Sequence, residues 1–430
     1  MKEIIKKIIF FILRVEAQLV LLRYRPKIIA ITGTVGKTTT KDAIFKALSK
    51  NLHVRKNNKS MNSEIGVPLT ILGLETGWNS PYHWIQNIVI GFFEIIYYPK
   101  YPDWLVLEIG IDHPGDMRRT ASWLRPDIAV LTAFGEVPVH VEFFEDPDDV
   151  TREEMDLINY LKKDGIIILN ADDEKAFKIK PYVKNKVYTF GTGENSDIMA
   201  SNYSVVYKDT RPTGISFKVN YDGKILPISI DGVIGNQMVY PILAALSVGI
   251  SMNLSIVDLS EGLNGFCPPK GRMNLLNGKN NTILIDDSYN SSPIAATSAI
   301  NNLAEIETVG KRIAILGDMA EIGRFSASEH RKIGSLVKRK KIDVLITVGV
   351  VSELMNEQAI EDGMAKSRNF HFSKSSDAIE TALQFLEPGN VFLVKGSQSA
   401  RMEKISKSIL TDSDSAGEVL VRQEVEWSSR

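Results

Sequence analysis

Residues 28–41 read IIAITGTVGKTTTK, and this stretch decides how the rest of the chain is interpreted. A β-branched run enters a turn that contains Gly33 and Gly36, and helical spacing follows. Glycines let the backbone curl so that successive N–H groups point at one anion, and the next helix adds the positive end of its dipole. Lys37 would reach the terminal phosphates of a nucleotide, and the Thr38 hydroxyl would help to bind magnesium. An ordinary turn would need the glycines but not the lysine and threonines, so the stretch predicts a phosphate-binding loop.

The composition limits the class of protein. The 430 residues are enough for two or three domains with a sizeable core. The chain has 51 basic and 52 acidic residues, and this balance gives no support for a nucleic-acid partner. Its single cysteine, Cys267, excludes an internal disulfide and fits a reducing compartment. We therefore expect a cytoplasmic protein.

Residues 1–25 are apolar but repeatedly interrupted by charge. Their longest uncharged run, residues 8–13, is far too short to cross a bilayer, and no cleavage site of a secretory signal follows. The pattern predicts an amphipathic helix, which either packs on its own domain or lies on the inner face of an anionic membrane. A second apolar helix, predicted at residues 84–98, either packs against the first or extends the same surface for a lipid or protein partner.

Two polar side chains follow predicted buried strands. Residues 104–108 end in Glu108, and residues 127–132 lead into a loop that carries His140. The carboxyl ends of parallel strands form the edge of the sheet where ligands bind. A carboxylate that leaves a buried strand needs a positive partner, for which magnesium is the obvious candidate. A lone histidine is usually structural, but the position of His140 favours a metal or phosphate role.

The remaining segments of the chain complete the predicted fold. Residues 57–70 form a predicted polar loop that ends in a Gly-Val-Pro turn, and the alternating pattern of residues 185–230 predicts antiparallel edge strands. After the linker at residues 266–272, every predicted strand ends in polar or glycine residues, as in a doubly wound sheet. We predict an α/β protein with an amphipathic N-terminal helix (1–25), a central P-loop ATPase domain with a parallel sheet (26–269) and a C-terminal Rossmann-like domain (270–430).

Several further motifs follow the phosphate loop in order. They are NSEIGVP at 62–68, LEIG at 107–110 with PGD at 114–116, PDIAVLT at 126–132 with HVE at 140–142, GR at 271–272, DDSYN at 286–290, LGDM at 316–319 with EIG at 321–323, and KGS at 395–397 with RME at 401–403. Together they resemble the Mur ligases, ATP-dependent enzymes that form amide bonds in cell-wall precursors. The resemblance covers residues 26–430 and is strongest to the branch that adds D-alanyl-D-alanine to UDP-N-acetylmuramoyl-tripeptide.

The resemblance implies a two-step ligation with ATP and Mg²⁺ as cofactors. A carboxylate of the muramoyl-peptide precursor attacks the γ-phosphate to give an acyl phosphate, and the amine of D-alanyl-D-alanine displaces phosphate. By the family pattern, the implied catalytic residues are Lys37, Glu108, His140, Glu154 and Arg272. The phosphates would be held by Gly33, Thr34, Gly36, Lys37, Thr38, Thr39 and Arg272, with Asp287 and Asn290 lining the nucleotide and hinge face. Thr38 and Glu108 would bind a first magnesium and His140 a second, and the dipeptide would sit near Asp318, Glu321, Lys395 and Ser397.

Three departures from the family pattern leave alternatives open. The N-terminal domain that grips the UDP-sugar has no counterpart, so the nucleotide end of the substrate is ignored, bound by a partner or replaced, for example by a lipid carrier. Glu154 stands where the family has a carbamylated lysine; it either holds the second magnesium or marks a lost activity. The third departure concerns the motif that helps to cradle the adenine. The family pattern is Gly-x-His-Asn…Asn, and residues 235–241 of this chain read GNQMVYP instead. A ligase for folate or an amino-acid polymer, and a silent nucleotide-binding scaffold, are the alternatives to a D-alanyl-D-alanine ligase.

Overall fold

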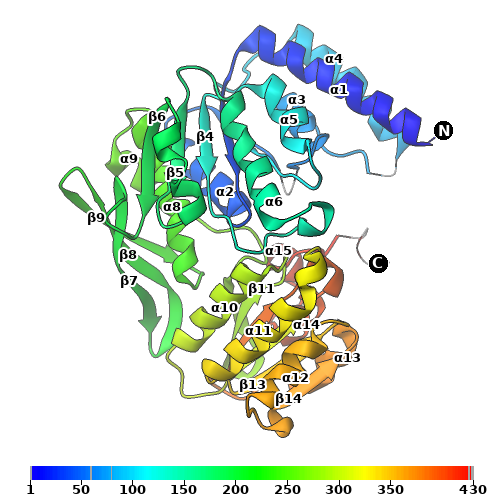
Figure 1. Cartoon of the computed structure of the whole chain (residues 1–430), viewed down its shortest axis with the longest axis vertical. Helices are drawn as coiled ribbons and strands as arrows, with labels where there is room; N and C mark the ends of the chain where they lie inside the picture. The colour runs from blue at the N-terminus through cyan, green and yellow to red at the C-terminus, as the bar shows by residue number, and fades with distance from the viewer. Residues whose placement is uncertain (1, 59–60, 79, 425–426, 428–430) are drawn as a thin grey trace.

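The computed structural model describes residues 2–58, 61–78, 80–424 and 427, and the side chains of residues 2–5 are not described. Residue 1 of the predicted N-terminal helix, residues 59–60 and 79 of the predicted central domain, and residues 425–426 and 428–430 of the predicted C-terminal domain therefore lie outside the described part. Figure 1 shows two α/β units, with the larger sheet in the upper part of the molecule and the smaller one in the lower part.

Buried aliphatic runs form the larger sheet, in the order β2-β3-β1-β4-β5-β6-β7-β8-β9. Its strands are β1 (Lys27–Thr32), β2 (Val54–Lys56), β3 (Trp104–Glu108), β4 (Ile128–Leu131), β5 (Ile166–Asn170), β6 (Lys186–Gly191), β7 (Ile198–Lys208), β8 (Arg211–Tyr221) and β9 (Lys224–Asp231). Neighbours from β2 to β7 are parallel, and β7, β8 and β9 form an antiparallel extension. The β1 strand therefore lies between β3 and β4, which places three carboxyl ends side by side.

Helices cover this sheet and include α2 (Lys37–Leu48), α3 (Gly66–Leu72), α5 (Asp116–Leu124), α6 (Pro147–Met155), α7 (Glu174–Phe177), α8 (Val239–Ser251) and α9 (Ile256–Gly262). Helices α2, α8 and α9 contact one another, and α8 is buried along all but one of its residues. A helix that is buried all round must be apolar, which explains why α8 carries no charged residue.

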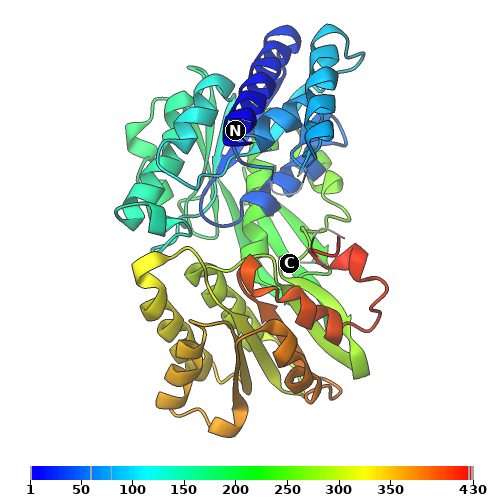
Figure 2. The same cartoon turned by 90° about the vertical axis from the view of Figure 1, so that its right-hand side faces the viewer.

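Two long helices pack side by side at the end of the molecule away from the smaller sheet (Figures 1 and 2). They are α1 (Lys2–Tyr24) and α4 (Pro81–Ile96), and both contact the rest of the large domain through buried residues. Phe10 lies near Trp84, with 6.1 Å between ring centres, and the Arg23 guanidinium donates to the Ile96 carbonyl. The two helices therefore run in the same direction. Within the described residues, neither these nor any other helix has the length and apolar character to cross a membrane.

The smaller sheet has the order β10-β11-β15-β12-β13-β14, and all its neighbouring strands are parallel except β10 and β11. Its strands are β10 (Asn274–Gly278), β11 (Thr282–Asp287), β12 (Arg312–Gly317), β13 (Val344–Val348), β14 (Asn369–Phe372) and β15 (Val391–Lys395). The helices of this domain are α10 (Pro293–Glu305), α11 (Ser326–Arg339), α12 (Glu353–Glu361), α13 (Ser375–Leu383), α14 (Glu403–Ile409) and α15 (Ala416–Val419). The predicted α/β class, with two units of this kind, is confirmed, while the boundaries after residues 25 and 269 stay predictions.

Two local predictions were wrong. Residues 66–68 begin helix α3 instead of forming a turn, because a proline in the first helical turn needs no hydrogen-bonded N–H. Residues 186–191 pair parallel to β5, so the antiparallel part of the sheet begins only at β7. The alternating pattern indicates a strand but carries no information about the direction of its neighbour.

Candidate active site

The loop between β1 and α2 has a backbone that requires glycine at two positions. Gly33 has φ +127° and Gly36 has φ +88°, and a Cβ at Gly33 would overlap the Thr132 hydroxyl. Helix α2 begins at Lys37, so the first N–H groups of the helix have no acceptor within it and are available to an anion. The N–H groups of Thr34 and Val35 instead donate to the Ala133 carbonyl, at 2.8 and 3.2 Å. The helix N-terminus, rather than the whole loop, therefore provides the anion-binding amides.

Lys37 and Glu154 meet above this loop. The Lys37 ammonium donates to the Gly33 carbonyl and to Oε1 of Glu154, which lies 3.3 Å away. The Thr34 hydroxyl donates to Oε2 of the same carboxylate at 3.1 Å. Glu154 comes from helix α6 and is buried. Burial raises the pKa of Glu154, and the Lys37 charge opposes this rise. The carboxylate thus holds the loop lysine close to the position of an incoming phosphate.

Glu108 is buried at the carboxyl end of β3 and is held by several neighbouring side chains. The Thr38 hydroxyl and the Asn62 amide donate to its Oε1 at 3.1 and 3.0 Å. The Lys41 ammonium lies 3.6 Å from Oε2, an oxygen that has no hydrogen-bond partner among the described residues. Asn57 fixes the backbone by bonding both the N–H and the C=O of Glu108, at 2.8 and 3.1 Å.

A hydroxyl beside a buried carboxylate with a spare oxygen suits magnesium, which takes its other ligands from phosphates and water. Within the described ranges, no group of three or more His, Cys, Asp or Glu side chains could hold a metal ion alone. Thr38 and Glu108 therefore fit a magnesium ion that arrives with a nucleotide rather than a permanent metal centre.

His140 links the two domains. Its Nδ1 lies 2.8 Å from Oε2 of Glu321 in the C-terminal domain, and its Nε2 lies 3.6 Å from Oδ1 of Asp112. The contact with His140 lowers the pKa of Glu321. Both partners are strained, since His140 has φ +68° and Glu321 has φ +62° without being glycine. No hydrogen bond or ion pair joins His140 to Glu154 in the described part of the chain, so their shared role at a second magnesium stays a prediction.

The C-terminal domain contributes a buried charged pair at the edge of its sheet. The register of β11 and β15 places Asp287 beside Lys395, and the Lys395 ammonium lies 2.7 Å from Oδ2 of Asp287. The same ammonium donates to the Asn290 carbonyl at 3.0 Å. Burial lowers the pKa of Lys395, and Asp287 opposes this change. Arg272 lies with its guanidinium 4.2 Å from the centre of the Tyr289 ring, at the junction between the domains.

Two predicted substrate residues, Asp318 and Ser397, accept hydrogen bonds from backbone N–H groups of their own domain. Asp318 accepts hydrogen bonds from the N–H groups of Val350 and Ser352, at 3.0 and 2.7 Å. The Ser397 hydroxyl accepts one from the Ala320 N–H at 2.8 Å. These contacts fasten together the loops that follow β12, β13 and β15. A direct substrate role for either side chain stays a prediction, and Glu321 is the predicted substrate residue that reaches the other domain.

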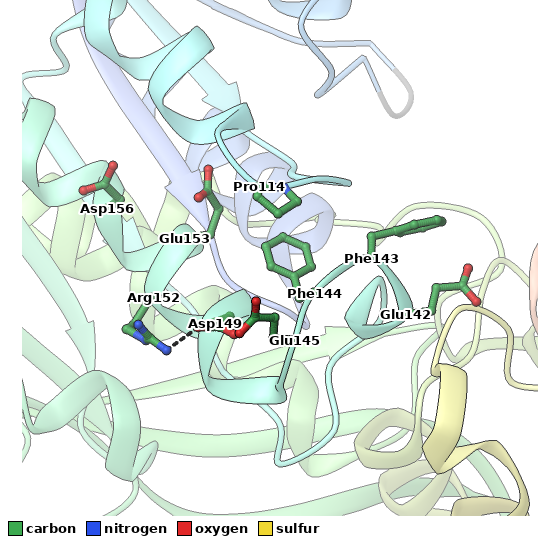
Figure 3. Close-up of a pocket in the computed structure, with 9 residues that line it drawn as sticks. All are labelled: Pro114, Glu142, Phe143, Phe144, Glu145, Asp149, Arg152, Glu153 and Asp156. Carbon is green, nitrogen blue, oxygen red and sulfur yellow. Dashed lines mark hydrogen bonds and ion pairs between the residues drawn. The ribbon is translucent and has the colours of Figure 1, made fainter.

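An open cavity of about 820 Å³ lies next to the His140 loop (Figure 3). It is lined by Pro114, Glu142, Phe143, Phe144, Glu145, Asp149, Arg152, Glu153 and Asp156. Arg152 is paired with Asp149 on the same helix, and Glu142 points away from the others toward the C-terminal domain. Because carboxylates outnumber the single arginine, the cavity favours a cationic group beside the His140 loop.

The structure brings together most of the predicted residues in small groups. Lys37 lies with Thr34 and Glu154, Thr38 with Glu108, and Lys395 with Asp287 and Asn290. Sequence reasoning assigned no role to Asn57, Asn62 or Lys41, all of which hold Glu108. Their signal was present as the polar loop at 57–70 and the final lysine of the opening stretch, but only the fold shows which carboxylate they serve.

Comparison with known proteins identifies a family domain in each half of the chain. The Mur ligase middle domain matches residues 31–249, and the Mur ligase, glutamate ligase domain matches residues 271–398. The chain is 26% identical over 388 residues to the UDP-N-acetylmuramoyl-tripeptide–D-alanyl-D-alanine ligase of Bacillus subtilis (strain 168), covering 89% of this chain and 76% of that protein. It is 28% identical over 393 residues to the Escherichia coli (strain K12) ligase of the same name, with the same coverage of 89% and 76%.

Solved structures share the fold. MurF from Acinetobacter baumannii superposes with a TM-score of 0.75 at 22% identity, covering 92% of this chain and 79% of that one. MurF ligase from Thermotoga maritima, in complex with ADP, gives 0.74 at 21% identity and covers 93% and 83%. Folylpolyglutamate synthase of Mycobacterium tuberculosis, complexed with ADP and AMPPCP, gives 0.65 at 13% identity and covers 92% and 94%.

Proposed function

The chain belongs to the Mur ligase family, and from this premise we propose that it is an ATP-dependent ligase that joins D-alanyl-D-alanine to a muramoyl-tripeptide precursor of peptidoglycan. The observation that carries the proposal is the arrangement of Lys37, Thr38 and Glu108 at one sheet edge. The His140–Glu321 contact brings the second domain to this edge. The curated relatives supply the identity of the two substrates.

The proposed first step transfers a phosphoryl group. An oxygen of the substrate carboxylate attacks the γ-phosphorus of ATP, the bond to the β,γ-bridging oxygen breaks, and ADP leaves with an acyl phosphate formed. The N-terminus of α2 and the Lys37 ammonium face the negative charge that shifts from the γ- to the β-phosphate. The Gly33 carbonyl and Glu154 hold the Lys37 ammonium in place before the nucleotide arrives. An incoming phosphate then competes with them for the lysine.

The proposed second step forms the amide. The amine of the dipeptide attacks the acyl carbon, the amine loses a proton, and inorganic phosphate leaves. Mg²⁺ held by Thr38, Glu108 and the phosphates would neutralise charge on the phosphate oxygens. Closure of the two domains through His140 and Glu321 brings the amine side of the site to the phosphate side, which makes the attack effectively unimolecular.

Phosphate release by the purified full-length chain tests the proposal. ATP and magnesium are supplied with muramoyl-tripeptide, either UDP-linked or lipid-linked, with and without D-alanyl-D-alanine. We expect release that requires both substrates, and the preferred carrier will show how the sugar end is held. Parallel reactions with a reduced folate and glutamate test the alternative that the folylpolyglutamate synthase fold represents. Release with the folate pair alone, or nucleotide binding without release under any pairing, would contradict the proposal.

A further inference from the structure

Helices α1 and α4 pack against each other, and each leaves apolar side chains exposed. Their exposed side chains recur every three or four residues, so each helix presents one apolar stripe. Among them, Phe11 and Leu22 on α1 and Ile85, Phe92, Phe93 and Ile96 on α4 are each at least half exposed. We call these six side chains the apolar ridge. The two helices lie at the end of the molecule farthest from the smaller sheet (Figures 1 and 2).

The packing between the two helices fixes the ridge as a rigid surface. Leu13, Ala17 and Val20 of α1 are fully buried, so this helix is anchored along its inner face. Gly91 lets α4 approach closely, because a Cβ there would overlap the Glu16 carboxylate. The ridge is therefore the outer side of a firmly packed helix pair. An apolar area of this kind in a monomer marks an interaction surface.

The charges around the ridge identify its partner. Lys7 on α1 and Arg25, the residue after this helix, are exposed, and Arg14 between them in the sequence is half-buried. The described side chains of α1 and α4 include two carboxylates, Glu16 and Glu94, and neither is exposed. Burial raises the pKa of both groups, which further reduces negative charge at this end of the molecule. The surface is therefore apolar at its centre and positive at its edge.

We propose that the apolar ridge docks on an anionic phospholipid bilayer, with α1 and α4 lying in the interface rather than crossing it. A second copy of the chain would bring the same positive edge against itself, whereas an anionic lipid surface neutralises it. Exposed Trp78 and Tyr82 at the start of α4 and Tyr97 at its end match the preference of aromatic rings for the headgroup level. The inference does not rest on the ligase activity.

Sedimentation of the full chain with vesicles tests the proposal. We expect the protein to pellet with vesicles that contain phosphatidylglycerol, to pellet much less with pure phosphatidylcholine, and to be released by salt. The combined substitutions Phe11→Ser, Leu22→Ser, Phe92→Ser and Phe93→Ser should lower the vesicle partition coefficient at least about 10-fold. Val309→Ser, at a still more exposed apolar position in the other domain, should leave it unchanged.

Two further measurements separate the proposal from its rivals. Lys7→Gln with Arg25→Gln should reduce binding to anionic vesicles but not the weak binding to neutral ones. Thermal melting shows whether each variant is folded, which surface substitutions should permit. A wild-type chain that stays in the supernatant, or a four-fold serine variant that pellets like wild type, would overturn the proposal. A wild-type dimer that this variant dissociates, without vesicle binding, would assign the ridge to self-association instead.

Discussion

At the scale of single residues, Lys37 carries the clearest prediction. Its ammonium is the one cation that the phosphate loop itself supplies, and it is already directed into the site by Gly33 and Glu154. We expect Lys37→Ala to reduce ATP-dependent phosphate release by about 100-fold or more, because positive charge at the transferred group is lost. Lys46→Ala, on the same helix but away from the loop, is the matched control. Ligation at the wild-type rate by the Lys37 variant would exclude this loop as the reaction centre.

A substitution of Glu154 tests whether this residue takes part in the reaction or marks a lost activity. Glu154→Gln keeps the shape of the side chain but removes the charge that faces Lys37 and Thr34. We expect phosphate release to fall about 10-fold or more, and the magnesium concentration for half-maximal rate to rise if Glu154 also binds the ion. Magnesium titrations of both proteins measure this, with Glu174→Gln on the surface as control. Identical titrations would mean that Glu154 has no part in the reaction.

The sequence identifies site residues whose signal is local. Lys37 and Thr38 follow the glycines directly, and Glu108 ends an apolar run, so chemistry and position agree within a few residues. Asp318 also ends a strand, yet its carboxylate binds two backbone N–H groups of neighbouring loops. A carboxylate at a strand end has the same sequence signal in both cases. Only the arrangement of distant loops distinguishes a substrate ligand from a structural one.

At the scale of elements, the contact between α1 and α4 is sensitive to pH. Glu16 lies buried against Gly91 and Leu72, and desolvation raises its pKa to about 7. The protonated form is favoured in the folded state, so the contribution of Glu16 to stability is full below its unfolded pKa and is lost as the pH rises toward 7. Glu16→Gln should therefore be more stable than wild type above pH 7, by at most about 3 kcal/mol.

Urea unfolding of both proteins across this pH range measures the effect. The difference between the two free energies of unfolding should grow between the unfolded and the folded pKa of Glu16 and then level off. Glu174→Gln, at an exposed position on α7, should follow the wild-type curve throughout. A Glu16→Gln variant that is equally less stable at every pH would show that the carboxylate is hydrogen-bonded in solution.

Elements were predictable where their periodicity is long, and less so where one residue type has two uses. The glycine loop, the parallel strands and the apolar helix at 84–98 follow from pattern alone. Pro68 with its neighbours predicts a turn, because proline breaks most helices, but it lies in the first turn of α3, where it is tolerated. The parallel pairing of β6 depends on its neighbour β5, which the alternation within residues 186–191 does not encode.

At the scale of the whole molecule, the His140–Glu321 pair is one of the contacts through which the two domains meet. The His140–Glu321 contact is partly open to solvent, and such pairs contribute about 0–1 kcal/mol. We expect Glu321→Ala to raise the KM for the dipeptide by about 2- to 5-fold through weaker closure, with little change in melting temperature. Steady-state kinetics and thermal melting together check this. A collapse of kcat at unchanged KM would instead place Glu321 among the groups that touch the reacting atoms.

The restart of strand and helix alternation after residue 272 was enough to predict two α/β units. Their relative placement was not predictable, because it depends on contacts such as the hydrogen bond from Arg324 to the Glu145 carbonyl, between residues far apart in the sequence. The proposed site takes residues from both units. The sequence therefore predicts which residues each unit contributes, but not how the two units face each other.

The most direct test of the account follows one oxygen atom. Muramoyl-tripeptide labelled with heavy oxygen in its terminal carboxylate is incubated with ATP, magnesium and D-alanyl-D-alanine, and the released phosphate is analysed by mass spectrometry. A carboxylate that attacks the γ-phosphorus must lose one of its oxygens to phosphate when the amide forms, so labelled phosphate equal in amount to the new amide is predicted. Unlabelled phosphate would mean that water attacks ATP, and the chain would then be a nucleotide hydrolase rather than a ligase.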